Sequence, residues 1–224
     1  MDDAILHRED TNAMATLTLN NPAKLNALSD AMLAAMTGAL AEIAADRSIR
    51  VVVLRGAGKA FCAGHDLREM TAGRQAPDKG RAYFADLFAR CSHMMNAVQA
   101  LPQPVIAQVH GIATAAGCQL VATADMAVAA ESCRFGVNGV NIGLFCSTPM
   151  VGLTRNVPAK KAFEMLVTGG FIPAQEACSL GLVNKVVPDG DLARETNALA
   201  ALVASKLGSA VKVGKQAFYK QRNM

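Results

Sequence analysis

Two turns built from small residues constrain this chain most. The first occupies residues 59–67 and the second residues 110–120, about fifty positions later. Each turn follows an extended apolar run, at 51–54 and 104–109, and each opens into a helical pattern. Two such strand–turn–helix units can point two backbone N–H groups at one carbonyl oxygen, which makes an oxyanion hole. The pattern therefore indicates an enzyme site built largely from backbone.

Composition favours one domain with a full core. The chain has 224 residues, of which 52% are apolar and only 4% aromatic, so Ala, Val, Leu, Ile and Met must fill that core. No apolar run is long enough to span a membrane. Residues 1–10 show neither a long apolar stretch nor an Arg-rich, acidic-poor composition, which argues against a secretory signal or a transit peptide. We therefore predict a cytoplasmic protein with no membrane partner.

Charge and cysteine usage exclude two further classes of protein. The net charge is +4, but the basic residues form no run, so nucleic-acid binding is not expected. A mildly basic surface suits an anionic small molecule better. Six cysteines are scattered without a CxxC or Cys/His ligand spacing, which indicates buried, reduced thiols and no metal site.

Hydrophobic periodicity alternates between strand and helix along the chain, which predicts an α/β fold. Strands are expected at 15–19, 51–54, 105–109, 126–130 and 182–187, and helices after the N-cap Ser29, at 81–101, 115–123, 159–168, from Pro173, and at 191–207. A surface loop is expected at 71–81 and irregular structure at 136–143. We predict a core over residues 1–158 and a helical C-terminal region over 159–224.

Both turns belong to a longer ordered series of motifs. These are Asn20-x-Pro22-x-Lys24-x-Asn26-Ala27-Leu28, the two turns themselves, Phe135-Gly136, Thr168-Gly169, Ala174-x-Glu176-Ala177 and Gly181-Leu182-Val183. In order and spacing the series resembles the crotonase superfamily, that is, the enoyl-CoA hydratase/isomerase family, over roughly residues 14–220. The resemblance implies a crotonase-like spiral of repeated ββα units with a C-terminal helical region. It also implies an acyl-CoA substrate, no separate cofactor, and a homotrimer or dimer of trimers.

The resemblance places the thioester oxygen between the backbone N–H groups of His65 and Ala116. Substrate and coenzyme A contacts carry over to Lys24, Ala27, Ala63, Gly64, His65, Asp66, Leu67 and Gly117. The Gly-Gly-Gly run typical of the family is Ala115-Ala116-Gly117 here, so the hole is expected to persist but to be slightly narrowed. One such donor contributes about 3 kcal/mol to stabilising a developing oxyanion.

Hydratases of this family use two glutamates for proton transfer, and both positions differ here. They correspond to Gln119 and Gly139. A glutamine amide can orient water but cannot accept a proton at neutral pH. Because acid–base assistance contributes about 10²- to 10⁴-fold per group, efficient hydration by the usual route is not expected.

Four other side chains are candidates for chemistry. His65 could titrate beside the thioester, although the favoured interpretation is that only its N–H matters. Asp66 is interpreted as shaping the turn. Ser147 lies near the position of a nucleophilic Asp in related dehalogenases, but the favoured role is N-cap of a helix beginning at Thr148 or Pro149. Cys146 is interpreted as a buried small hydrophobe.

The sequence therefore supports an acyl-CoA thioester-processing enzyme that retains the hole without the carboxylates. The alternatives are a non-catalytic acyl-CoA-binding protein and a thioester hydrolase or decarboxylase on the same scaffold. Family members usually continue for some tens of residues beyond the region of Phe218, in a tail that covers the acyl pocket. We therefore expect either that this tail lies outside the sequence given or that the coenzyme A site is incomplete.

Overall fold

A six-stranded sheet forms the centre of the chain, which the computed structural model describes over residues 4–222. Its strands, in spatial order, are β1 (Leu6–Thr11), β2 (Met14–Leu19), β3 (Val51–Gly56), β4 (Val105–Val109), β6 (Met126–Ala130) and β9 (Lys185–Val187). β1 and β2 form an antiparallel hairpin, and every later pairing is parallel. The predicted α/β class is thus confirmed.

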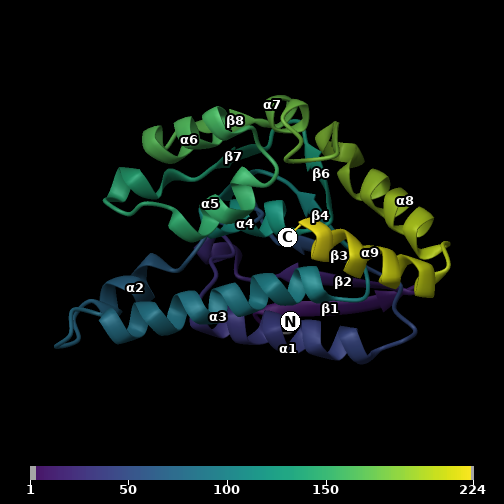
Figure 1. Cartoon of the computed structure of the whole chain (residues 1–224), viewed down its shortest axis with the longest axis horizontal. Helices are drawn as coiled ribbons and strands as arrows, with labels where there is room; N and C mark the ends of the chain where they lie inside the picture. Colours follow the sequence, from purple (N-terminus) through teal and green to yellow (C-terminus); the bar gives the residue numbers. More distant parts are fainter. Residues whose placement is uncertain (1–3, 223–224) are drawn as a thin grey trace.

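Each central strand is buried on both faces. Val52 and Leu54 of β3 belong to the larger apolar cluster, which includes residues of α1 (Asp30–Ala45) and α3 (Arg81–Ala100). Val51 and Val53 belong to a second cluster, completed by α8 (Leu192–Ala204). Alternate side chains of a strand point to opposite faces, so helices cover both sides of the sheet (Figure 1).

A smaller three-stranded sheet carries the second turn. It consists of β5 (Ile112–Thr114), β7 (Arg134–Gly136) and β8 (Phe171–Pro173). The helices near it are α4 (Ala116–Thr123), the 3-10 helix η2 (Asn138–Ile142), α5 (Ser147–Thr154), α6 (Ala159–Thr168) and α7 (Ala174–Ser179). Short strands and small residues let this layer approach the first turn closely.

Residues 159–222 contribute to both sheets as well as the final helices. β8 pairs with β7 and β9 pairs with β6. The last helix, α9 (Gly208–Arg222), is fixed by Lys215, whose Nζ lies 2.7 Å from Asp125 Oδ2 and 3.0 Å from the Val98 carbonyl oxygen. The Tyr219 hydroxyl donates to Asp125 Oδ1 at 2.8 Å.

Several elements differ from the expectation, and the short strands β5, β7 and β8 and the last helix α9 were not predicted. β1 was not predicted, because Leu6–Thr11 is a polar, half-exposed edge strand without an apolar run. The predicted loop at 71–81 begins late, because α2 (Leu67–Gly73) extends into it. The strand expected at 182–187 is only Lys185–Val187. Among residues 4–222, no helix combines the length and apolar composition needed to cross a membrane.

Candidate functional site

The two turns pack backbone against backbone. The Cys62 carbonyl oxygen accepts from Thr114 N at 3.0 Å, and Cys62 N donates to the Ile112 carbonyl oxygen at 3.2 Å. A Cβ atom at Gly117 would lie 2.1 Å from that Cys62 oxygen, and one at Gly64 would lie 3.3 Å from Ala116 N. Only glycine permits this approach at both positions, and Gly64 also has a φ of +92°.

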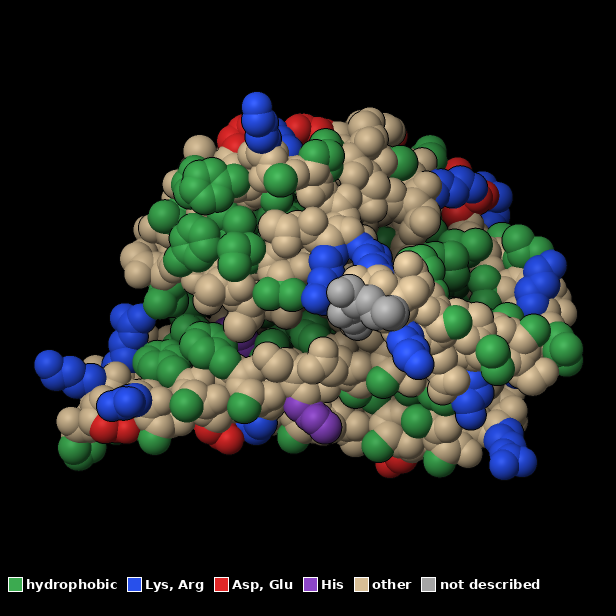
Figure 2. Space-filling model, viewed as in Figure 1, with side chains coloured by type: hydrophobic (Ala, Val, Ile, Leu, Met, Phe, Trp, Pro, Cys, Tyr) green, Lys and Arg blue, Asp and Glu red, His purple; other side chains and the backbone are tan. Residues whose placement is uncertain are grey.

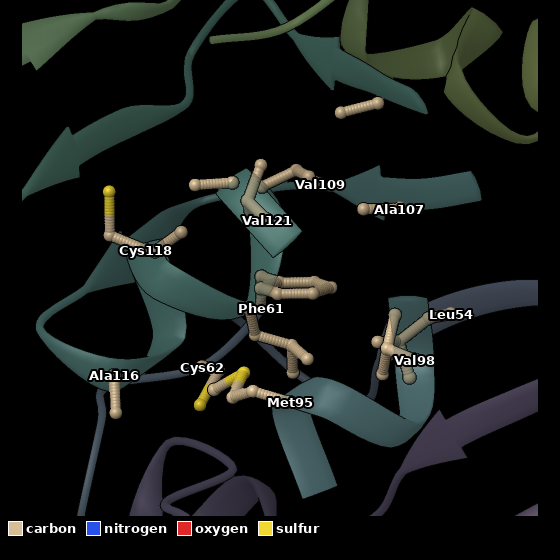
Figure 3. Close-up of a cluster of buried hydrophobic side chains, with 14 of the residues drawn as sticks. Leu54, Phe61, Cys62, Met95, Val98, Ala107, Val109, Ala116, Cys118 and Val121 are labelled. Carbon is tan, nitrogen blue, oxygen red and sulfur yellow. The ribbon is translucent and has the colours of Figure 1, made fainter. Parts of the chain in front are cut away.

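An apolar cluster holds the turns in this arrangement. Phe61, fully buried, lies between Val121 of α4 and Leu54 of β3 (Figure 3). Cys62 of the first turn lies next to Met95 of α3 in the same view, whereas the Ala116 methyl points away from the Phe61 ring. The positions of the two turns are therefore fixed by the core rather than by their own loops.

Two backbone N–H groups are left without partners at this junction. Neither His65 N nor Ala116 N donates to any acceptor within residues 4–222. Ala116 is the first residue of α4, so no intrahelical acceptor exists for its N–H, and the helix end carries partial positive charge. This is the pair of donors that the family resemblance implies for the oxyanion hole.

Both residues line an apolar cavity of about 310 Å³. Its walls come from α2 and α3 on one side and from η2 and the start of α5 on the other, and its lining residues are Ala63, His65, Leu67, Met70, Phe88, Thr114, Ala115, Ala116, Asn138, Gly139, Ile142, Leu144, Phe145, Cys146, Ser147, Thr148 and Pro149. The volume suits a small-molecule site, and no lining residue is a carboxylate. A larger open cleft of about 610 Å³ beside α1 and the α8–α9 junction contains neither turn.

Some of the remaining predicted contact residues line the cavity and others do not. Ala27 is 6% exposed, and Gly64 and Gly117 are buried where the turns meet. Ala63 and Leu67 line the cavity directly. Within the described chain, no group of three or more His, Cys, Asp or Glu side chains is placed to hold a metal ion.

Asp66 shapes the first turn, and Lys24 is bound to it. Asp66 Oδ1 accepts from Arg68 N at 2.9 Å as the N-cap of α2, and Lys24 Nζ lies 2.7 Å from Asp66 Oδ2. Burial alone would raise the pKa of Asp66, but the bonds from Lys24 and Arg68 N lower it overall. In this structure the Lys24 ammonium is therefore paired with a carboxylate.

The His65 ring is held as a neutral imidazole. Its Nδ1 lies 3.3 Å from the Leu28 carbonyl oxygen, which can only accept, so Nδ1 carries the proton. Nε2 is buried with no partner in the described chain, and the ring contacts Phe88 edge-on at 5.9 Å between centroids. Burial lowers the pKa of His65 and outweighs the effect of the Leu28 bond. This geometry favours a role through the backbone N–H.

The two positions of the missing glutamates have different environments. Gln119 lies on α4, 8% exposed and outside the cavity lining, and its Oε1 is buried with no partner among the described residues. Gly139 lines the cavity, but a Cβ there would lie 2.6 Å from the Leu144 carbonyl oxygen and 2.8 Å from Cys146 Sγ. The loop thus leaves no space for any side chain at Gly139.

Ser147 is not the helix N-cap that the sequence predicts. α5 begins at Ser147 itself, so Cys146 occupies the N-cap position and makes no side-chain cap bond. Cys146 Sγ instead accepts from Gly139 N at 3.3 Å, and burial raises the pKa of its thiol. No described side chain hydrogen-bonds Ser147 as a base would. These contacts do not favour nucleophilic catalysis at either residue.

One polar pair in the cavity was not identified from sequence. Thr114 Oγ1 donates to Asn138 Oδ1 at 2.6 Å, and both residues line the cavity. Asn138 lies in the segment 136–143, for which the sequence predicts only irregular structure. The two partners lie 24 positions apart, so no local pattern indicates that they pair. The only feature of the sequence that drew attention to Asn138 was its place directly before Gly139.

The chain is similar in sequence to one family of known proteins. A family model described as Enoyl-CoA hydratase/isomerase matches residues 9–224. Enoyl-CoA hydratase domain-containing protein 3, mitochondrial, from Homo sapiens is 46% identical over 210 residues, covering 94% of this chain and 68% of the relative. The Xenopus laevis protein of that name is 45% identical over 213 residues, covering 95% and 71%.

Solved structures of the same family superpose closely on this chain. A crystal structure of enoyl-CoA hydratase from Mycobacterium smegmatis superposes with a TM-score of 0.94 at 54% identity, covering 98% of this chain and 84% of that one. Human enoyl-CoA hydratase domain-containing protein 3 gives 0.91 at 43% identity, covering 97% and 84%. These neighbours confirm the fold predicted from the motifs.

The same comparisons correct the predicted location. The vertebrate relatives are named mitochondrial, which contradicts the cytoplasmic prediction. That prediction depended on the composition of residues 1–10. A targeting segment is recognised only from its own residues, so ten residues without its pattern do not fix where a protein resides.

Proposed function

This chain belongs to the enoyl-CoA hydratase/isomerase family, and on that premise we propose that it processes acyl-CoA thioesters. The thioester oxygen lies between the N–H groups of His65 and Ala116, which stabilise an enolate-like intermediate. The observation that carries the proposal is that both groups lack an acceptor in the described chain and line one apolar cavity. Loss of one such donor costs about 3 kcal/mol of transition-state stabilisation.

The absence of a carboxylate in the cavity favours chemistry that needs no protein base. Loss of CO₂ from an acyl group carrying a β-carboxylate meets this condition. The bond between Cα and the carboxylate breaks, its electron pair moves into the thioester carbonyl, and the resulting enolate oxygen is held by the two N–H groups. CO₂ leaves, and water returns a proton to Cα. Hydration would be slow, because the attacking water must lose a proton.

Steady-state assays with malonyl-CoA and crotonyl-CoA test this function. We expect CO₂ release from malonyl-CoA to exceed hydration of crotonyl-CoA, and Gly64→Ala to reduce it about 10²-fold or more by displacing Ala116 N. Gly38→Ala is the matched control, since a Cβ there meets nothing within 4 Å. Hydration at ordinary hydratase rates would contradict the requirement for a base-free reaction.

The second candidate is an acyl-CoA-binding protein without turnover. The observation favouring it is that His65 and Cys146, the titratable residues lining the cavity, are both held in their neutral forms by burial. Calorimetry with acyl-CoA ligands, paired with product analysis, separates binding from turnover. Thioester hydrolysis remains a weaker alternative, and unchanged cleavage after replacing Ser147 and Cys146 by Ala would exclude it. We also propose the homotrimer or dimer of trimers typical of the resemblance.

A further inference from the structure

The Thr114–Asn138 pair presents a fixed hydrogen-bond donor to the cavity. Because Asn138 Oδ1 already accepts from Thr114 Oγ1 at 2.6 Å, the amide orientation is set and Nδ2 keeps both of its N–H donors. No described group accepts from Nδ2, and it is not among the fully buried polar atoms that lack partners. Asn138 is half-buried and lines the cavity, so Nδ2 is available to a ligand there.

The pair lies beside the proposed oxyanion hole. Thr114 ends β5 two residues before Ala116, and Asn138 opens η2 directly before Gly139. Thr114, Ala116 and Asn138 all line this cavity, so a ligand whose thioester oxygen is held at Ala116 N occupies the cavity that Asn138 lines. The hydroxyl groups of Ser147 and Thr148 line the same cavity.

The polar groups of the cavity are unbalanced toward donors. His65 N, Ala116 N and Asn138 Nδ2 are hydrogen-bond donors that have no acceptor among the described residues. No carboxylate lines the cavity to accept from them. The His65 ring cannot supply the missing acceptor, because Nδ1 is bound to Leu28 and Nε2 is buried. A ligand with surplus oxygen acceptors satisfies these donors, and a plain alkyl chain does not.

We propose that Asn138, oriented by Thr114, is a specificity-determining residue that selects acyl-CoA thioesters carrying an oxygen acceptor on the acyl group close to the thioester. This inference rests on the proposed function and narrows its substrate class. A 3-oxo group, a 3-hydroxy group and a β-carboxylate each supply such an acceptor. A site built to hydrogen-bond a substrate group discriminates against an analogue that lacks it, because the site's polar group is then left unpaired.

Calorimetric titration with four short-chain thioesters tests the proposal. The probes are butyryl-CoA, acetoacetyl-CoA, 3-hydroxybutyryl-CoA and malonyl-CoA. We expect the unmodified protein to bind at least one oxygenated thioester about tenfold more tightly than butyryl-CoA. The identity of the preferred probe distinguishes the three sources of the acceptor.

Isosteric variants assign that preference to the pair. Asn138→Leu should abolish the tenfold preference without weakening butyryl-CoA binding, and Asn138→Asp should weaken malonyl-CoA most, by charge repulsion. Thr114→Val keeps Asn138 but removes the hydroxyl that orients the Asn138 amide, so the preference for oxygenated thioesters should decrease. Asn141→Ala, in the same 3-10 helix but outside the cavity lining, should preserve the preference. Thermal unfolding confirms that each variant is folded.

The titrations distinguish failure of the role proposed for Asn138 from failure of the proposed acyl-CoA processing. Equal binding of butyryl-CoA and every oxygenated probe, or an undiminished preference in folded Asn138→Leu, would overturn the selection proposed for Asn138 and leave acyl-CoA processing intact. No binding of any thioester would overturn the proposed function itself, and this inference with it.

Discussion

Ala115 has a backbone conformation that glycine adopts far more readily. Its φ of 50° and ψ of −122°, directly before the first residue of α4, represent strain on the order of 1–3 kcal/mol. Ala115→Gly should release that strain. Glycine also increases the entropy of the unfolded chain, which lowers stability by about 0.4–1 kcal/mol, so the free energy of unfolding should rise by about 1 kcal/mol overall. Urea unfolding measures the change. Ala122→Gly, inside α4, should instead lose about 1 kcal/mol, and a loss in both variants would contradict the assignment of strain.

Restoring the two glutamates should not restore hydration. Glu at position 119 would be buried outside the cavity, so burial would raise its pKa and disfavour its charged form. Glu at position 139 would clash with the Leu144 carbonyl and should destabilise the fold by about 2 kcal/mol or more. We expect no gain in crotonyl-CoA hydration by Gln119→Glu, alone or combined with Gly139→Glu. A large gain would show that the loop accommodates the carboxylate.

The buried His65 imidazole predicts a loss of stability in mild acid. Its pKa in the fold lies below the value of 6.5 expected when unfolded, so protons bind the unfolded chain more readily. The stabilisation is complete above pH 6.5 and is lost as the pH falls through the folded pKa. Urea midpoints at pH 7.5 and 5.5 should differ less in His65→Gln than in the unmodified protein. Equal differences would place the titration elsewhere.

At the scale of elements, α9 is held by polar contacts rather than by an apolar face. Lys215 is its one buried residue within the described range, and it binds Asp125 in the body of the protein. Lys215→Met would leave the Asp125 carboxylate without its cation, a change that costs about 3–5 kcal/mol in buried pairs. Amide hydrogen exchange should rise across 208–222 while β3 stays protected. Lys212→Met, exposed on the same helix, should change neither, and unchanged protection in both variants would contradict this role.

Elements governed by local periodicity were predicted well. The helix after Ser29 and the helix at 81–101 appear as expected, because apolar residues recur at helical spacing. Long-range polar contacts were not predictable. Lys215 and Asp125 lie 90 positions apart, and no sequence pattern indicates that they pair. The same distinction holds in the site. The motifs predicted the donors His65 N and Ala116 N, whereas the Thr114–Asn138 hydrogen bond could be identified only from the structure.

At the scale of the whole molecule, exposed apolar side chains predict self-association. Hydrophobic groups gather over α5 and α6 on the face shown in Figure 2. Phe163 of α6 is 63% exposed and Val151 of α5 is 45% exposed. Exposed apolar patches of this kind mark interaction surfaces, and a stable interface buries about 800 Å² on each partner. The proposed trimer would cover such a patch.

Replacing Phe163 by Asp tests this assembly. A charge at a buried apolar contact is costly to desolvate, so Phe163→Asp should shift the oligomer toward monomer at micromolar concentration. Leu202→Asp is the control, because Leu202 is 56% exposed but lies on α8. Sedimentation velocity measures the mass of each variant. A monomeric unmodified protein would rule out the trimer, and a trimer retained by Phe163→Asp but lost in Leu202→Asp would move the interface from α6 to α8.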